Sequence, residues 1–258
     1  MKDRKMLMRV LIGVSIVFLV AGMAAMAQAV DFSIGGGAGM APDYEGSDDY
    51  EVVPIPFAEA KFSNGMYVQL KGLKAKANII PSNIWKLGPV YNYRPSRSDV
   101  DNSKVDDLKN VSDAHELGGF GGFQYYGWFA NVEFLADTGD AYDGWHATLK
   151  AGYNWILTNW VFSVGGSTSY ANGEYMSTYF GIDGADSARS GLPTYDADKG
   201  IKDWGVDLGI NWRMTQRLSL QGFASYTRLI GDADDSSPVV DEGSENQFFG
   251  GALVVFTF

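Results

Sequence analysis

Apolar and polar residues alternate with a period of two along most of this chain. In residues 145–155 the odd-numbered positions are all Trp, Ala, Leu or Tyr, and the even-numbered positions are His, Thr, Lys, Gly and Asn. Residues 203–213 repeat the pattern, with Trp204 and Trp212 at the two ends of the apolar face. Successive side chains point to opposite faces in a β-strand, whereas no segment after Val30 keeps the helical spacing i, i+3, i+4, i+7 over three turns. We therefore expect the chain after residue 29 to be all-β.

The positions of the tryptophans distinguish two all-β architectures that share this alternation. A β-sandwich or soluble barrel would bury the apolar face inside, whereas a transmembrane barrel would turn it outward to lipid. The tryptophans lie at strand ends, as in the interfacial girdles of outer-membrane barrels, and not in mid-strand. The last segment alternates from Phe248 to Phe258 and ends on Phe, which is typical of such barrels. The sequence therefore predicts a transmembrane antiparallel up-and-down β-barrel with a polar lumen.

The composition fits a barrel better than a helical membrane protein. Mean hydropathy is −0.11, which is too polar for a bundle of transmembrane helices, although 14% of the residues are aromatic. Strands that show one face to lipid and the other to a polar lumen average to a hydropathy near zero. The formal charge is −11, from 20 Lys and Arg against 31 Asp and Glu, and the sequence has no basic stripe. We therefore expect no nucleic-acid partner.

Loop lengths predict the orientation of the barrel. Outer-membrane barrels have short periplasmic turns and longer outer loops. The segments 157–159 and 214–216 are short, whereas 95–114, 171–200 and 230–246 are long and acidic. The expected girdle positions are Trp155, Trp160 and Trp212 on the periplasmic side and Trp145 and Trp204 on the outer side.

Eleven segments have the pattern of a strand, but bacterial barrels have an even number of strands. We therefore expect twelve strands, with ten as the alternative. The missing strand falls either before residue 84, at the kink Lys71-Gly72-Leu73, or in residues 171–182. The expected strands are 31–40, 51–62, 65–80, 84–94, 115–125, 127–136, 143–156, 159–170, 201–213, 216–229 and 247–258.

Residues 1–29 have the three parts of a secretory signal peptide. Four basic residues precede an apolar run from Val10 to Ala21, and Ala27-Gln28-Ala29 has the A-x-A pattern of a cleavage site. We expect cleavage before Val30, so that residues 1–29 are a cleaved signal peptide and residues 30–258 form the barrel. A membrane anchor is the alternative, because residues 10–27 carry no charge.

Two motifs could carry chemistry, but the barrel explains each more simply. The run Gly35-Gly36-Gly37-Ala38-Gly39 lacks the following helix that a phosphate-binding loop needs, and small residues allow neighbouring strands to approach closely. Ser63-Asn64-Gly65 resembles a lipase-type motif, yet Lys61 stands where the histidine base would be, and Asn-Gly favours a hairpin turn. We therefore expect no enzymatic activity and no catalytic residues.

Neither a cofactor nor a metal site is expected. His115 and His146 are the only histidines, lack ligand partners at useful spacing, and are interpreted as polar lumen or strand-end residues. Two carboxylate runs could bind Ca²⁺ or Mg²⁺, ions that also bridge lipopolysaccharide phosphates, but neither run has the spacing of a calcium loop. We interpret both as solvated loop charge. The runs are Asp43, Glu45, Asp48, Asp49, Glu51 and Asp232, Asp234, Asp235, Asp241, Glu242.

Charged residues of both signs are expected to face the lumen. We expect them to form pairs across it that close a narrow barrel, with a small pore as the alternative. These residues are Lys86, Arg94, Glu133, Lys150, Asp207 and Arg213.

Irregular motifs in the predicted loops and strand ends resemble the MltA-interacting protein (MipA)/OmpV family of outer-membrane proteins. The resemblance covers residues 30–258 and is specific because several motifs occur in the family's order. In the first half they are Gly37, Gly39, Pro42, Tyr44, Gly46, Ser47, Pro54-Ile55-Pro56, Gly88-Pro89 and Tyr93-Arg94. In the second half they are Tyr179-Phe180-Gly181-Ile182, Ser190-Gly191-Leu192-Pro193-Thr194-Tyr195, Gly200-Ile201-Lys202-Asp203, Tyr226-Thr227-Arg228-Leu229-Ile230-Gly231-Asp232-Ala233 and Ser237-Pro238-Val239-Val240.

The resemblance implies a non-enzymatic barrel in the outer membrane of a Gram-negative cell. Family members are described as scaffolds that bring a lytic murein transglycosylase and a bifunctional murein synthase together. Others are described as adhesins, osmotic-response proteins or antibiotic-susceptibility factors. We therefore expect a peptidoglycan-related scaffold that contacts outer-membrane lipid, lipopolysaccharide and these two murein enzymes. The alternative is a narrow outer-membrane channel, or an adhesin with ligand contacts in the acidic outer loops.

Overall fold

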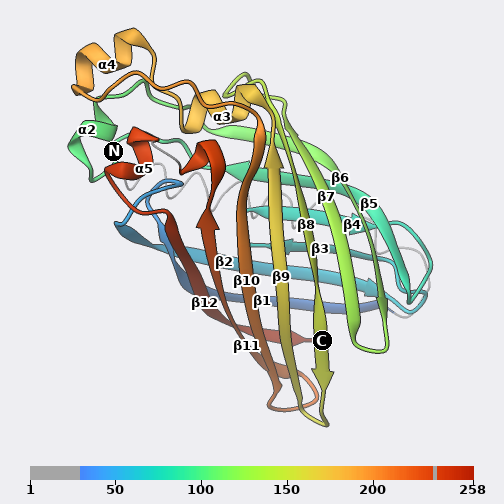
Figure 1. Cartoon of the computed structure of the whole chain (residues 1–258). Helices are drawn as coiled ribbons and strands as arrows, with labels where there is room; N and C mark the ends of the chain where they lie inside the picture. Colours follow the sequence, from blue (N-terminus) through green and yellow to red (C-terminus); the bar gives the residue numbers. More distant parts are fainter. Residues whose placement is uncertain (1–29, 235–236) are drawn as a thin grey trace.

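Twelve antiparallel strands close into a single barrel in the computed structural model, which describes residues 30–234 and 237–258 (Figure 1). Each strand pairs with its neighbours in the chain, and β1 pairs with β12 to close the ring. The predicted all-β barrel and the count of twelve strands are confirmed. The predicted signal peptide, residues 1–29, and Asp235 of the second carboxylate run lie outside the described residues.

Most strands are long enough to cross a bilayer at the tilt usual for such barrels. The exceptions are β3 and β4, with five residues each. The strands are β1 (Val30–Pro42), β2 (Tyr50–Phe62), β3 (Tyr67–Lys71), β4 (Lys74–Asn78), β5 (Trp85–Arg94), β6 (Ala114–Tyr125), β7 (Trp128–Asp137), β8 (Trp145–Ile156), β9 (Trp160–Ala171), β10 (Gly200–Arg213), β11 (Leu218–Leu229) and β12 (Asn246–Thr257).

The expected single strand 65–80 is wrong, because the chain reverses inside it. Gly72 has a φ of +60°, a left-handed conformation that glycine adopts without strain, and Lys71 pairs with Lys74 across the turn. The kink Lys71-Gly72-Leu73 therefore supplies the missing strand. The other expected location, residues 171–182, contains the helix α3 (Gly173–Tyr179) instead.

The two ends of the barrel differ in their connections. One end, here called the short-turn end, carries the tight turns other than the one at Gly72, together with Val30 and Phe258. The other, the long-loop end, carries short helices that the alternation did not predict (Figure 1). These are α2 (Ser103–Asp106), α3, α4 (Gly184–Ser190), α5 (Pro238–Asp241) and the 3-10 turn η1 (Gly231–Ala233). Among the described residues, no helix is both long and apolar enough to span a bilayer.

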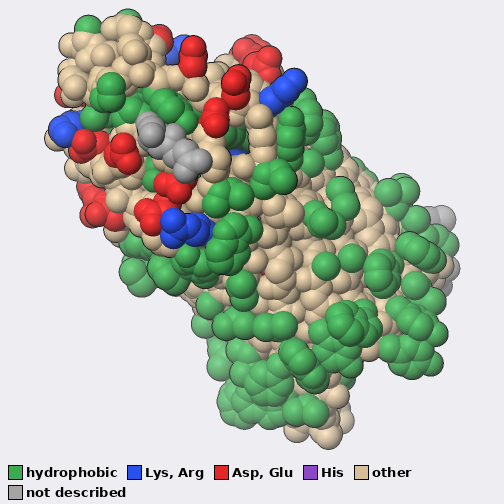
Figure 2. Space-filling view, viewed as in Figure 1, with side chains coloured by type: hydrophobic (Ala, Val, Ile, Leu, Met, Phe, Trp, Pro, Cys, Tyr) green, Lys and Arg blue, Asp and Glu red, His purple; other side chains and the backbone are tan. Residues whose placement is uncertain are grey.

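The long loops fold into a cap with its own apolar core. One cluster joins Tyr142, Tyr175, Phe180 and Val240, and a second joins Tyr44, Val105, Leu192 and Val239 with their neighbours. Figure 2 shows acidic side chains gathered over this end, while the wall in view is largely free of charge.

Apolar side chains cover the outside of the barrel wall. The exposed set comes from the faces that the alternation predicted to meet lipid, and side chains of the opposite face fill part of the lumen. The exposed set includes Leu87, Leu117, Val132, Phe134, Leu149, Phe162, Val164, Val206, Leu208, Ile210, Val254 and Phe256.

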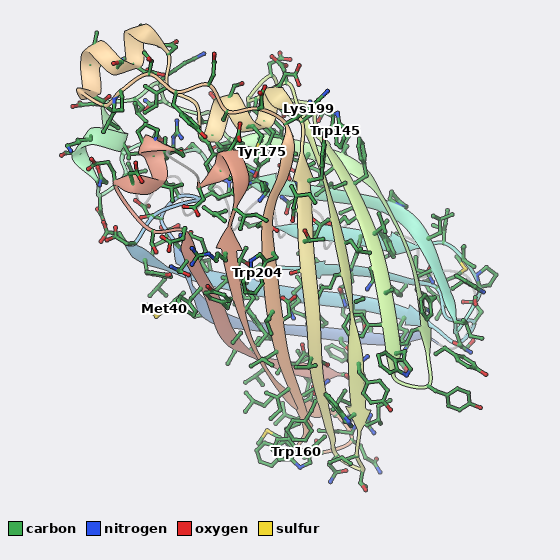
Figure 3. The ribbon with its side chains drawn as sticks, viewed as in Figure 1. Met40, Trp145, Trp160, Tyr175, Lys199 and Trp204 are labelled. Atoms are coloured by element: carbon green, nitrogen blue, oxygen red, sulfur yellow. The ribbon has the colours of Figure 1, made fainter. Side chains whose placement is uncertain are left out.

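Tryptophans lie near both ends of the wall, as the sequence predicts. Trp160 and Trp212 stack at the short-turn end, with ring centroids 5.0 Å apart. Trp145 lies at the opposite end, beside Tyr170, and Trp204 lies close to the start of β10 (Figure 3).

The seam between β1 and β12 provides a test of the fold. A side chain at Gly37 would collide with the backbone of Ala252 and Leu253, whereas a side chain at Gly36 would meet no atom within 4 Å. Because backbone cannot yield as a flexible side chain can, Gly37→Val should destabilise the closed barrel by about 3 kcal/mol or more. Urea unfolding in detergent, followed by the difference in gel mobility between boiled and unboiled protein, measures the loss.

Gly36→Val is the matched control, since it adds an apolar group on the outward face of the same strand. It should leave the unfolding midpoint nearly unchanged. Equal destabilisation by both variants would contradict the described register of β1 and β12.

Candidate functional site

Five ionisable residues meet inside the mouth of the barrel, directly below the cap. Glu45, from the β1–β2 loop, lies between two cations: its Oε1 is 2.5 Å from Lys202 Nζ, and its Oε2 is 3.6 Å from Arg94 Nη1. Arg94 Nε also lies 2.9 Å from Glu116 Oε1, and Lys202 Nζ lies 2.6 Å from Asp203 Oδ2. We call Glu45, Arg94, Glu116, Lys202 and Asp203 the mouth network. It ties one loop to β5, β6 and β10.

Helix α3 covers the mouth network with aromatic rings. The Tyr175 hydroxyl donates a hydrogen bond to Glu45 Oε2 at 2.6 Å, and the Tyr175 side chain is 0% exposed. The Arg94 guanidinium lies 5.2 Å from the Tyr175 ring centroid and 5.1 Å from that of Tyr179, within the range of cation–π attraction. On the adjoining side, Tyr142 donates to Glu116 Oε1 at 2.9 Å. The helix therefore acts as a plug held by both charge and ring contacts (Figure 3).

A local capping interaction fixes where α3 begins. Asn172 Oδ1 accepts hydrogen bonds from Tyr175 N at 3.2 Å and from Trp145 N at 2.9 Å. An asparagine at this position satisfies one of the amide groups that a helix start leaves free. The second bond attaches the start of the helix to the start of β8. Tyr175 is thereby directed toward Glu45.

Burial and charge act in opposite directions on Glu45. Its side chain is only 19% exposed, and burial alone would raise the pKa of the carboxyl group. Lys202 and Arg94, together with the hydrogen bonds from Lys202 and Tyr175, outweigh burial and lower the pKa to about 2. Burial and the Glu45 charge raise the pKa of Tyr175 well above its usual value, so Tyr175 remains a donor at neutral pH.

The lumen below the network holds a cavity of about 1370 Å³. Lys150 Nζ lies 2.8 Å from Asp207 Oδ1, so two of the expected lumen residues form an ion pair with each other. Glu133 forms an ion pair with Lys74, a residue outside the expected set. Of the other expected lumen residues, Lys86 donates to Ser82 O at the short-turn end, and Arg213 is exposed at the end of β10.

The remaining motifs have structural roles. The run Gly35-Gly36-Gly37-Ala38-Gly39 lies within β1, and Ser63-Asn64-Gly65 forms the β2–β3 turn, where Asn64 Oδ1 accepts a hydrogen bond from Met66 N. His146 is buried at the start of β8, 3.6 Å from Glu116. His115 lies at the start of β6, where its Nδ1 is 2.8 Å from the Tyr91 hydroxyl. Both histidines are thus strand-end residues, as expected.

The interpretation of the first carboxylate run as solvated charge is wrong for one of its members, Glu45. Glu45 belongs to the mouth network, and Asp43 accepts a hydrogen bond from Asp101 N at 3.0 Å, which joins two loops. In the second run Asp232 accepts from Asp198 N at 2.8 Å. Within residues 30–234 and 237–258, no three His, Asp or Glu side chains are arranged to hold a metal ion.

Of the mouth network, only Arg94 is among the lumen residues that the alternation predicts; its partners are not. Glu116 and Lys202 are each the third residue of their strand, close enough to its start that a charged side chain looks like part of an ordinary loop boundary. Lys202 and Asp203 do belong to a motif that carries the family resemblance. The local pattern Asn172-Gly173-Glu174 is a helix-start signal that could have revealed α3.

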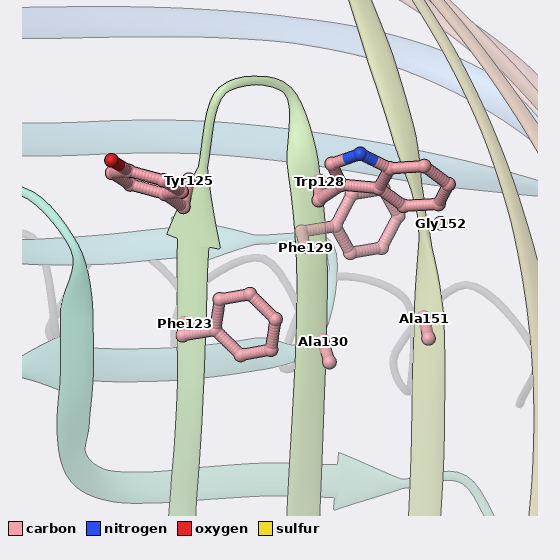
Figure 4. A pocket seen from close by; sticks show the side chains of 7 residues that line it. All are labelled: Phe123, Tyr125, Trp128, Phe129, Ala130, Ala151 and Gly152. Carbon is pink, nitrogen blue, oxygen red and sulfur yellow. The ribbon is translucent and has the colours of Figure 1, made fainter.

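A second, smaller hollow of about 540 Å³ lies at the short-turn end of β6, β7 and β8 (Figure 4). It is lined by Phe123, Tyr125, Trp128, Phe129, Ala130, Ala151 and Gly152. Its lining is aromatic and uncharged, which suits contact with lipid at a membrane interface.

The mouth network predicts a pH dependence of the cap. Because the folded state lowers the pKa of Glu45 from 4.5 to about 2, its stabilising contribution is complete above about pH 4.5. The contribution should be lost as the pH falls toward 2. Glu45→Gln should destabilise the closed cap at pH 7 by roughly 2–3 kcal/mol and flatten the acid transition. Hydrogen exchange of the α3 amides measures both effects.

Glu242→Gln is the control, because Glu242 pairs with Lys104 on the exposed part of the same cap. It should leave the α3 amides as protected as in the parent protein. An acid transition of unchanged size in Glu45→Gln would show that other groups hold the plug.

Comparison with solved structures gives remote matches to outer-membrane barrels. An outer membrane channel from Pseudomonas putida F1 has 12% identity and a TM-score of 0.47, covering 91% of this chain and 97% of that one. KdgM porin has 10% identity and a TM-score of 0.44, covering 88% and 99%. The translocator domain of autotransporter NalP from Neisseria meningitidis has 9% identity and a TM-score of 0.45, covering 93% and 91%.

The sequence itself identifies the family. No curated protein matches the chain significantly. Residues 34–258 match the family described as MltA-interacting protein MipA, which spans the barrel from β1 to the C-terminal residue. The match includes the strands and loops that build the mouth network. The chain therefore belongs to the MltA-interacting protein MipA family.

Proposed function

We propose that this outer-membrane barrel is a non-enzymatic scaffold that binds a murein transglycosylase at its short-turn end. The observation that carries the proposal is the plugged mouth: the mouth network and the rings of Tyr175 and Tyr179 occupy the route that a solute would need. A barrel closed in this way suits binding better than passage. The family description, MltA-interacting protein, supports the choice of partner.

The orientation follows from the difference between the two ends. In barrels of this type short turns face the periplasm, where murein is built and degraded. The short-turn end also exposes apolar side chains at the tips of its turns. Tyr126, 81% exposed, and Leu157 lie on turns next to the aromatic girdle. Exposed apolar residues at the edge of a lipid-facing surface are suited to contact with another protein.

The turn tips provide the test of the scaffold. Tyr126 has a φ of +46°, which asparagine tolerates, so Tyr126→Asn combined with Leu157→Ser removes apolar contact area without straining the turn. Copurification of a murein transglycosylase from crosslinked envelopes should fall at least tenfold. Ile201→Ser, at the exposed long-loop end, should have no effect. Unchanged copurification with the double variant would contradict docking at the turns.

The lumen cavity favours a narrow channel as the second candidate function. Planar-bilayer recording separates the two, and the parent protein should give no steady current steps. Replacing both Tyr175 and Tyr179 by Ala removes the rings above Arg94 and should produce steps, because water and ions can then enter the mouth. Ser177→Ala, on the exposed side of α3, should remain silent. Steady conductance from the parent protein would favour the channel.

A further inference from the structure

The wall of the barrel is incomplete beside the long-loop half of β2. This strand pairs with β1 along its whole length, but with β3 only over residues 57–61. The β3–β4 hairpin reverses at Gly72, whose N–H donates to Pro56 O at 2.9 Å. Among the described residues, none pairs with this edge of residues 50–55. Figure 1 shows β2 extending further toward the helices than β3 and β4 do.

The opposite side of the gap is formed by β5. The ladder between β4 and β5 ends where Lys74 faces Asn92, and Tyr93 N donates to Leu73 O at 3.1 Å. Beyond this point β5 pairs only with β6. We call the opening between residues 50–56, the hairpin tip and residues 93–95 the wall window. The hydrogen bond from Asp101 N to Asp43 Oδ2 closes it at the top.

Two prolines on β2 suit an edge that stays open. Residues two apart in a strand direct their backbone groups to the same side, and Pro56 O points to the hairpin. The backbone nitrogens of Pro54 and Pro56 therefore face the window. Neither carries an N–H, so the edge has fewer donors that lipid would leave unsatisfied. Any other residue at position 54 would place such a donor there.

The lumen cavity reaches the wall window. Its lining includes Pro54 and Pro56 on one side, Tyr93 and Pro95 on the other, and Gly72 below. Pro54 shares the outward face of β2 with Val52, which is 73% exposed. The cavity therefore borders both edges of the wall window.

Two lysines that line the cavity beside the wall window form no direct ion pair within the described residues. Lys71 Nζ lies 4.8 Å from the Phe223 ring centroid, and Lys76 Nζ lies 5.5 Å from that of Phe120. Neither forms an ion pair with a carboxylate in the part of the chain that the structure describes, whereas Lys74 and Lys150 do. Both line the cavity together with apolar rings. The site thus combines positive charge with an apolar exit.

We propose that the wall window admits an anionic amphiphile from the surrounding membrane leaflet. Its carboxylate or phosphate head is held in the lumen by Lys71 and Lys76, and its single acyl chain leaves between β2 and β5. The head gains two charge-assisted contacts inside the lumen cavity. The chain stays in contact with apolar side chains and lipid along its length.

Binding to the purified barrel in nanodiscs of zwitterionic lipid tests the proposal. The probes are a sixteen-carbon fatty acid, a single-chain phospholipid with a phosphate head, and the uncharged alcohol of the same chain length. The fatty acid, the phospholipid or both should bind at least tenfold more tightly than the alcohol, and the tighter of the two identifies the head group. Equal binding of all three would overturn the proposal.

Variants locate the head and the chain. Lys71→Gln combined with Lys76→Gln should weaken binding of the anionic probes at least tenfold, while Lys86→Gln, outside the cavity, should not. A photoreactive group at the chain end should label residues 50–56 or 93–95. Labelling confined to the cap, or unchanged affinity in the double variant, would overturn the proposal. Gel mobility of unboiled protein verifies that each variant is folded, and copurification through the turn tips tests the scaffold separately.

Discussion

Backbone hydrogen bonds must be satisfied within the protein wherever this chain meets lipid, because hydrocarbon offers neither donors nor acceptors. The pairing of β1 with β12 meets this requirement around the ring. Glycines such as Gly37 allow that seam to close, since a side chain there would strike the backbone of the neighbouring strand. The same requirement explains Pro54 and Pro56, which remove donors where the ring is left open. The closed ladder of the wall and the prolines at the wall window thus both answer the need to leave few backbone donors unsatisfied in lipid.

Much of this wall could be predicted from the sequence. A strand with one face in lipid and one in a polar lumen must alternate, and the tryptophans near Trp160 and Trp145 mark where it crosses the interfaces. The turn at Gly72 is readable as the place of a missing strand, because the alternation changes phase there: apolar residues are even-numbered up to Leu70 and odd-numbered from Leu73. A local change in the pattern marks where a strand ends. How far a hairpin extends along the wall depends instead on its pairing with the strands on either side.

The mouth network could not be predicted in the same way. Glu45 and Lys202 are 157 residues apart, and neither position carries a local pattern that requires the other. Their meeting depends on the closed ring, which brings the β1–β2 loop beside the start of β10. Charge at this place is costly to bury unless each group is paired, and here Arg94, Tyr175 and Asp203 complete the pairing. Removing one partner would leave the other charge buried, without an ion-pair partner and without water to hydrate it.

The mouth and the wall window therefore differ in which surroundings of the barrel they exclude from the lumen. At the mouth, paired charges and the rings of α3 close the route to water, whereas at the wall window an unpaired edge leaves a route to lipid. Extending the β3–β4 hairpin by a few residues would complete the wall and would remove the need for proline on β2. The short hairpin instead places Lys71 next to the Gly72 turn, at the lower edge of the wall window. Its ammonium group faces the cavity there, beside Phe223. A lumen closed to water and open to the membrane is better suited to a ligand that partitions into lipid than to a dissolved solute.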